Sequence, residues 1–219
     1  GLLNRGTIDA QGKLDVHATN IVNGVAQATD VATAHLGGAQ VKLVADNRFS
    51  NRAGSTTPAS CTNSGSPCGG IAATDDLSIT AAKFANANTG VIYGRNAATI
   101  NLTKAAYQNQ GTIASEGHAT LYMPGALDLD GTALAPTTGK DGLLTIKATG
   151  DITVKNGLQS AGDVLLQSGS SIDNLSNVVA GGRLNATAQH IVNEANGLIW
   201  AGKEVSLIGV QAIRNERNA

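Results

Sequence analysis

The fold is decided by the stretch NGLQSAGDVLL at residues 156–166, because other parts of the chain repeat its pattern. Residues 109–121 read NQGTIASEGHATL and residues 196–207 read NGLIWAGKEVSL, each with a turn, a short apolar strand, a glycine turn and a second strand. The second strands at 144, 164, 184 and 205 begin about 20 residues apart. A unit this short cannot enclose its own core, so each repeat must stack on the next as a solenoid.

Three apolar positions recur in each repeat. The second strand alternates apolar and polar residues, as in Leu144-Thr145-Ile146, which directs its apolar side chains to one side. One large apolar residue follows six to eight residues later: Ile21, Phe49, Phe84, Tyr107, Ile152, Ile172, Ile191 or Ile213. The short strand that comes first in each repeat contributes Ile8, Ile71, Ile92, Ile113, Leu158, Val179 and Ile199. These sets predict an all-β protein, a right-handed parallel β-helix of about nine coils with a narrow aliphatic core.

Asparagine and glycine mark the corners of the predicted coils. Both residue types tolerate the left-handed backbone region that tight corners need. Seven asparagines fall near one corner, and we expect their side chains to hydrogen-bond along the axis: Asn4, Asn23, Asn51, Asn109, Asn156, Asn193 and Asn215. Neither Leu2-Leu3 nor Ala212-Ile213 resembles a cap, so we expect residues 1–219 to be a single β-helix segment of a longer fibre.

Composition argues against nucleic-acid binding, membrane insertion and disorder. The formal net charge is −1, whereas binding to nucleic acid requires a basic surface. No run of apolar residues approaches the length of a membrane-spanning helix, so we expect no insertion into a membrane. The apolar content of 42% is too high for a disordered chain.

Three insertions break the repeat, at residues 24–37, 52–70 and 131–142. Long loops on a rigid scaffold often carry function, but they are also tolerated as neutral decoration because closing a longer loop costs little entropy. Residues 25–36, part of which is compatible with a helix, and residues 55–69 are the favoured binding segments.

The second insertion contains both cysteines, Cys61 and Cys68, in a polar loop. We predict a disulfide between them and therefore an oxidising compartment. A zinc site would need two further ligands, and no histidine lies within 25 residues of either cysteine. The bridge would preorder the enclosed loop, which makes Thr62, Asn63 and Ser64 candidate binding residues.

Two aspartates offer the one candidate for catalysis. Asp128 and Asp130 share a face of a strand about 7 Å apart, which suits an inverting glycosidase or a calcium ion. We expect no neighbouring coil to supply a matching acidic or basic cluster, which favours a solvated strand face. The four histidines, His17, His35, His118 and His190, lie in different coils. We therefore predict no metal site, no cofactor and no catalytic residue.

Three aromatic residues are expected on the outer surface. Tyr93 and Trp200 each follow an inward isoleucine of the first strand, and Tyr122 lies between two apolar residues of a second strand. Exposed aromatic rings stack on sugars or anchor protein partners. Tyr93 and Trp200 are therefore further candidate binding residues.

Residues 6–14 (GTIDAQGKL), 111–117 (GTIASEG) and 179–187 (VAGGRLNAT) resemble haemagglutinin repeats. Such repeats form the shafts of filamentous haemagglutinin-like two-partner-secretion exoproteins of Gram-negative bacteria, and the stick proteins of contact-dependent growth inhibition. The resemblance covers most of the chain outside the insertions. The Asn-Pro-Asn signature of the family's amino-terminal secretion domain is absent, which favours an interior segment. The predicted disulfide departs from the family's low cysteine content.

The resemblance implies a non-enzymatic virulence protein that is secreted through an outer-membrane transporter partner and displayed on the bacterial cell surface. It implies cell adhesion through a glycan or protein receptor, or delivery of a toxin. The sequence does not separate adhesin from stick protein. The alternative hypothesis is a polysaccharide-degrading β-helix enzyme that uses Asp128 and Asp130.

Overall fold

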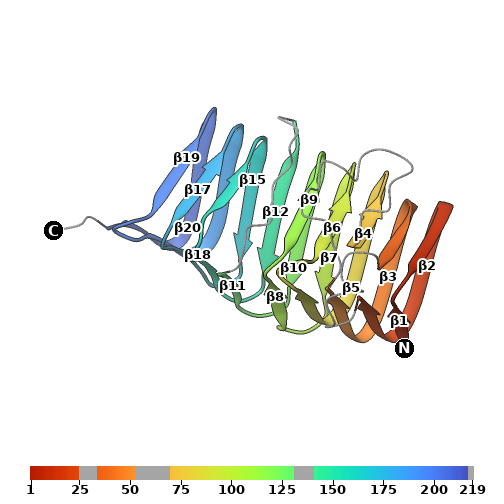
Figure 1. The fold of residues 1–219 in the computed structure, drawn as a ribbon. Coiled ribbons are helices and arrows are strands. Elements are labelled where there is room, and N and C mark those ends of the chain that lie inside the picture. The colour runs from red at the N-terminus through yellow and green to blue at the C-terminus, as the bar shows by residue number, and fades with distance from the viewer. Residues whose placement is uncertain (25–33, 53–69, 131–140, 217–219) are drawn as a thin grey trace.

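The computed structural model describes residues 1–24, 34–52, 70–130 and 141–216, and their secondary structure is entirely β. Figure 1 shows parallel strands stacked side by side along one axis from the N-terminus to the C-terminus. The strands are β1 (Leu2–Asn4), β2 (Thr7–Asn23), β3 (His35–Asn51), β4 (Gly70–Ala73), β5 (Asp76–Asn86), β6 (Val91–Gly94), β7 (Ala97–Leu102), β8 (Tyr107–Asn109), β9 (Thr112–Ser115), β10 (His118–Met123), β11 (Leu127–Leu129), β12 (Leu143–Ala148), β13 (Ile152–Val154), β14 (Leu158–Ser160), β15 (Asp163–Ser168), β16 (Ser171–Asn174), β17 (Asn177–Ala180), β18 (Arg183–Asn193), β19 (Leu198–Ala201) and β20 (Glu204–Asn215).

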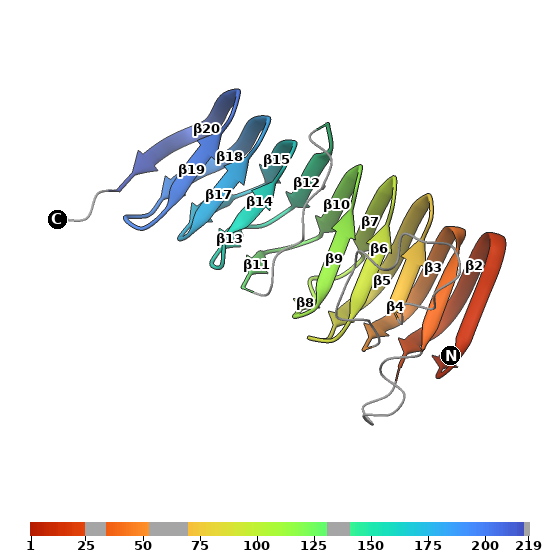
Figure 2. The ribbon, with the colours of Figure 1, turned by 45° about the horizontal axis from the view of Figure 1, so that its top comes forward.

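The predicted second strand recurs nine times among the described residues, in β2, β3, β5, β7, β10, β12, β15, β18 and β20. Each copy pairs in parallel with the copy before it, so Leu144, Val164, Leu184 and Val205 form one row. These nine stacked strands belong to a solenoid of about eight turns, compared with the about nine coils predicted. The predicted parallel β-helix is therefore confirmed, and its arrangement is consistent with the right-handed form (Figure 2).

The core contains the predicted apolar rows. Ile79, Leu121, Leu144 and Ile152 are fully buried, in agreement with the alternation of the sequence. One assignment is wrong, because Val178 and not Val179 pairs with Leu158 and Ile199. Either valine satisfies an apolar pattern, so only the pairing of β17 with its neighbours distinguishes them.

An aromatic stack fills the core of three successive coils. The ring centroids of Phe49 and Phe84 lie 5.3 Å apart, and those of Phe84 and Tyr107 lie 5.4 Å apart. The rings are nearly parallel, at 14° and 11°, since parallel strands place equivalent side chains directly above one another. Phe49 and Phe84 are buried and Tyr107 is partly buried. Burial raises the pKa of the Tyr107 phenol well above its usual range.

A ladder of asparagine side chains runs along one corner. Each Nδ2 donates to the Oδ1 of the asparagine in the next coil, at 2.7–3.0 Å, in two runs: Asn4, Asn23, Asn51, Asn86 and Asn109, then Asn174, Asn193 and Asn215. The structure therefore confirms that an asparagine ladder runs along the axis, but its members differ from those predicted. The prediction was wrong to include Asn156 and to omit Asn86 and Asn174. An insertion separates Asn51 from Asn86, whereas Val154 and not Asn156 is the register partner of Asn174.

The ladder is interrupted where Leu129 and Val154 occupy the corner, since Leu129 pairs with Val154 and Val154 with Asn174. The first member of each run has no donating asparagine behind it, and its Oδ1 instead accepts from the backbone N–H two residues ahead. Asn4 accepts from Gly6 and Asn174 from Ser176, both at 3.3 Å. Local turns thus satisfy the oxygen where the ladder begins.

The strand boundaries shorten the predicted insertions. His35 to Gly38 pair with Thr7 to Ala10, so residues 35–37 belong to the solenoid and not to the insertion. Gly70 likewise belongs to β4, in register with His35. Leu36 is a fully buried core residue that the sequence pattern missed, because the glycines at 37 and 38 made this strand resemble a loop.

The apolar interior is accessible at both ends of the described stack. At the first end, Leu2 and Ile8 pack against the core but are only partly buried, and at the last end Ile213 is 50% exposed. A recess of about 590 Å³ at the C-terminal coil is lined by Ile191, Leu198, Ile199, Val205, Leu207 and Ile213, among others. Within the described residues, β1 is the first element of the stack and β20 the last.

Candidate functional site

The favoured loop candidates lie outside the described residues. Residues 25–33 and 53–69 are not described, and they include Cys61, Cys68, Thr62, Asn63 and Ser64. The predicted disulfide and the loop binding residues therefore stay predictions. Residues 131–140 of the third insertion also lie outside.

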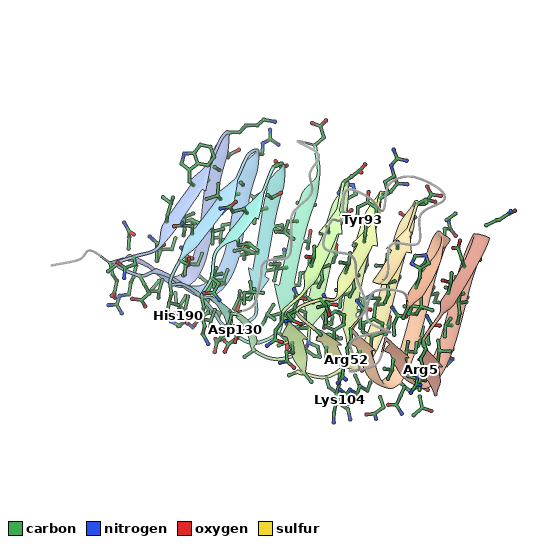
Figure 3. All side chains as sticks on the ribbon, in the orientation of Figure 1. Arg5, Arg52, Tyr93, Lys104, Asp130 and His190 are labelled. Atoms are coloured by element: carbon green, nitrogen blue, oxygen red, sulfur yellow. The ribbon has the colours of Figure 1, made fainter. Side chains whose placement is uncertain are left out.

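Tyr93 is buried, which contradicts its predicted exposure. Only 6% of the residue is accessible, although its strand position does point away from the core (Figure 3). Its neighbours in register are Ala72 and Ala114. The phenol donates to Glu116 Oε1 at 2.7 Å, and Arg95 Nε lies 3.4 Å from Glu116 Oε2.

This cluster of Tyr93, Arg95 and Glu116 links two successive coils. Its tyrosine hydroxyl already has a partner within the chain, and little of the ring remains accessible. A buried, hydrogen-bonded tyrosine stabilises the surface but presents little area to a receptor. The cluster is therefore structural, and the sequence pattern missed it because it joins residues about 20 positions apart on successive coils.

Trp200 is exposed, as predicted, with 49% of the residue accessible. It lies on β19 in register with the partly buried Val179 of β17. Leu198, two residues earlier on the same strand, is 47% exposed. Trp200 and Leu198 form an accessible apolar patch at the C-terminal coil, and an indole at such a position can stack on a sugar ring.

Tyr122 also points outward, and 38% of it is accessible. It lies on β10 between Asn101 of β7 and Lys147 of β12 in register. The two exposed rings lie on different strands, and no stacking between them is found among the described aromatic residues. Trp200 is therefore the stronger of the two candidate contacts.

Asp128 forms an ion pair that the sequence analysis did not anticipate. Lys155 Nζ lies 2.7 Å from Asp128 Oδ2, and this hydrogen bond raises the pKa of the Lys155 ammonium. The expectation concerned a cluster of charged residues, and the structure shows one basic partner for Asp128. Asn156 donates to the backbone carbonyl of Asp130, beyond the end of β11. Both aspartates are exposed, and Thr153 is the register neighbour of Asp128.

Two more aspartates, Asp151 and Asp173, lie one and two coils beyond Asp128 on the same sheet. Asp151 Oδ1 accepts the backbone N–H of Ser171 at 2.9 Å, and hydrogen bonds from Ser170 and Ser171 lower the pKa of its carboxyl. Burial raises the pKa of Asp173, with a further increase from the negative charge of Asp151 and an opposing effect of His190. The sequence analysis missed this group, although the 20-residue period aligns Asp151 with Ser171 and reveals it.

The histidines do not converge. His17 Nε2 lies 2.7 Å from Asp46 Oδ1 on the exposed surface, and His190 pairs in register with Ser171. Among residues 1–24, 34–52, 70–130 and 141–216, no group of three or more His, Cys, Asp or Glu side chains is placed to hold a metal ion. No helix long and apolar enough to cross a membrane occurs in the described part of the chain.

Comparison of the chain with protein-family models, with curated proteins and with solved structures gave no match.

Proposed function

We propose that the chain is a non-enzymatic segment of a secreted, cell-surface bacterial adhesin or contact-dependent inhibition stick protein. It acts as a rigid shaft and presents its insertions to a glycan or protein receptor. An outer-membrane transporter would be its partner in secretion. This proposal combines the repeat resemblance in the sequence with the architecture of the stack.

The observation that carries the proposal is the alignment of hydrogen bonds with the long axis. The backbone pairings of parallel strands run from coil to coil along the stack. The asparagine ladder adds buried side-chain bonds in the same direction, as from Asn23 to Asn51 at 3.0 Å. Bending or stretching such a rod strains many bonds at once, so the arrangement suits a stiff spacer.

We assign recognition to two insertions and to one exposed aromatic residue. The first candidates are residues 25–33 and 55–69, since residues 34–36 of the predicted segment are buried, and the exposed ring of Trp200 is the second. Tyr93 is withdrawn from the candidates because it is buried. Loops and exposed aromatic residues on a rigid scaffold bind with little loss of entropy in the scaffold itself.

The surroundings of Asp128 give little support to the alternative of a polysaccharide-degrading enzyme. Its carboxylate is engaged by Lys155 at 2.7 Å on an exposed surface. A general acid in a glycosidase requires a protonated carboxyl, usually in an apolar site, which an adjacent ammonium opposes.

The test is binding of the fluorescently labelled chain to a panel of bacterial and host cells. We expect saturable binding that falls when residues 55–69 are deleted, and a smaller decrease for Trp200→Ala. Tyr122→Ala is the matched aromatic control. Far-UV circular dichroism must show the same β content for each variant. Absence of binding by the folded chain would leave a passive shaft, and depolymerisation of a polysaccharide that stops in Asp128→Asn would favour the enzyme.

A further inference from the structure

One face of the solenoid carries charges of opposite sign at its two ends. This face, named here the ladder face, consists of the short strands β1, β8, β11, β13 and β16 and the C-terminal parts of β2, β3, β5, β18 and β20, with their flanking turns. The described basic residues nearer the N-terminus are Arg5, Arg48, Arg52, Lys83 and Lys104. The acidic residues nearer the C-terminus are Asp128, Asp130, Asp151, Asp173, Glu194 and Glu216.

Figure 3 shows this division along one side of the molecule. Arg5, Arg52 and Lys104 lie toward the N-terminal end and Asp130 toward the C-terminal end. The charges of the other sign are fewer: Asp46, which is hydrogen-bonded to His17, in the basic half, and Lys155 and Arg214, which pair with Asp128 and Glu216, in the acidic half. The two halves therefore keep opposite net charge.

The basic half has no internal compensation. None of its five basic side chains forms an ion pair with another described residue. Arg48 and Lys83 are exposed neighbours in register, which brings two positive charges together on adjacent strands. They border a shallow groove of about 290 Å³, to which Ala85, Ala106 and Gln108 also contribute. A partner that supplies negative charge here would relieve the repulsion.

In the acidic half, two carboxylates lie on adjacent coils. Asp151 and Asp173 lie in adjacent coils, since Ile152 pairs with Ile172 and Thr153 with Asp173. Asp173 is partly buried, and this burial raises its pKa, with a further increase from the neighbouring carboxylate of Asp151. Like charges held this close favour a positively charged partner.

We infer that the ladder face binds the same face of a second copy of this chain, antiparallel about a twofold axis, with each basic half on the other copy's acidic half. Twofold pairing uses one surface twice and closes on itself, so it gives a dimer and not a filament. An acidic ligand would explain the basic half alone, whereas a second copy accounts for both halves. Complementary charge across such a face chiefly sets orientation and association rate.

The size of the face fits this partner. Ten strand rows, from β1 to β20, at about 4.8 Å spacing span about 43 Å, and five residues across each row span about 16 Å. The product, about 700 Å² per copy, is close to the roughly 800 Å² that each partner buries in a standard specific interface.

The test is sedimentation velocity of the chain at about 0.02 M and about 0.5 M salt, because screening weakens contacts between exposed charges. We expect a dimer at low salt whose dissociation constant rises at least about tenfold at high salt. Two double charge reversals are compared: Arg48→Glu with Lys83→Glu, and Asp173→Lys with Glu194→Lys. Lys42→Glu with Lys147→Glu, on strands of another face, is the control and should leave the dimer intact.

Each ladder-face variant alone should be monomeric, because in its homodimer the two reversed side chains of one copy face unreversed side chains of the same sign on the other copy. An equimolar mixture of the two variants should restore the dimer, since every contact again joins opposite charges. A wild-type monomer at about 100 μM and low salt, where standard interfaces are populated, would overturn the inference. Failure of the mixture to associate would also overturn it, and binding of polyglutamate through Arg48 and Lys83 by such a monomer would assign the basic half to an acidic ligand. The assay uses no receptor, so it is independent of the proposed function.

Discussion

Replacing Asn51 by alanine tests whether the asparagine ladder stabilises the rod. Asn51 is fully buried, and its Nδ2 donates to Asn86 Oδ1 at 3.0 Å and to the carbonyl of Val91 at 3.1 Å. Its Oδ1 accepts from Asn23 Nδ2 at 3.0 Å. Removing the amide therefore breaks three buried hydrogen bonds and leaves Asn86 Oδ1 without its donor from this coil.

The expected loss follows from the net worth of buried hydrogen bonds. Three such bonds at about 1 kcal/mol each give about 3 kcal/mol, and an unpaired buried oxygen adds to this. We expect Asn51→Ala to lower the free energy of unfolding by about 3–5 kcal/mol. Asn185→Ala is the matched control, because Asn185 is exposed on β18, and it should change stability by about 0.5 kcal/mol or less.

The assay is urea unfolding followed by far-UV circular dichroism and by the fluorescence of Trp200, the single tryptophan. Circular dichroism reports on the whole stack and the indole on the last coil, so the two signals together reveal whether unfolding is cooperative. A loss for Asn51→Ala no larger than that for Asn185→Ala would refute the argument that the ladder stabilises the fold.

Three further changes test the core, the acidic surface and the corner glycines. Phe84→Ala removes the central ring of the stack and should destabilise the protein by about 3–5 kcal/mol in urea unfolding, more than the same change at the partly buried Tyr107. Asp173→Asn should raise the melting temperature slightly at pH 7 but not at pH 3. The raised pKa of Asp173 means that its ionisation disfavours the folded state as pH rises, a penalty that the amide removes. Gly181→Ala should lower the melting temperature because a Cβ there would lie 2.1 Å from a backbone oxygen, whereas Gly6→Ala, with no atom within 4 Å, should not.

The sequence indicated the core rows better than the surface. An apolar residue at every second position of a strand has one buried side whatever lies next to it, so Leu144 and Ile146 could be placed inside from local alternation. Tyr93 shows the limit of this reasoning. Its neighbour Ile92 is the core residue of this strand, yet Tyr93 is buried too, and its phenol donates to Glu116 of the next coil.

The candidate site residues also divide into those that the local pattern predicts and those that contacts between coils decide. The exposure of Trp200 followed from its place beside an inward isoleucine, and it is confirmed. The ion pair between Asp128 and Lys155 was missed, because it joins residues 27 positions apart in sequence. Contacts between coils depend on the length of chain between them, and this length is not constant.

The sequence by itself determined that the chain is a parallel β-solenoid, because a repeat of about 20 residues has no way to bury its apolar positions except against its neighbours. The tertiary structure alone decided which residues meet across coils. Asn4 and Asn23 are 19 residues apart, whereas Asn51 and Asn86 are 35 apart, yet both pairs are direct neighbours in the ladder. Insertions change the sequence separation without changing the stacking distance of the strands. The exact membership of the ladder, the burial of Tyr93 and the two charged halves of the ladder face therefore appear only when the coils are brought into register.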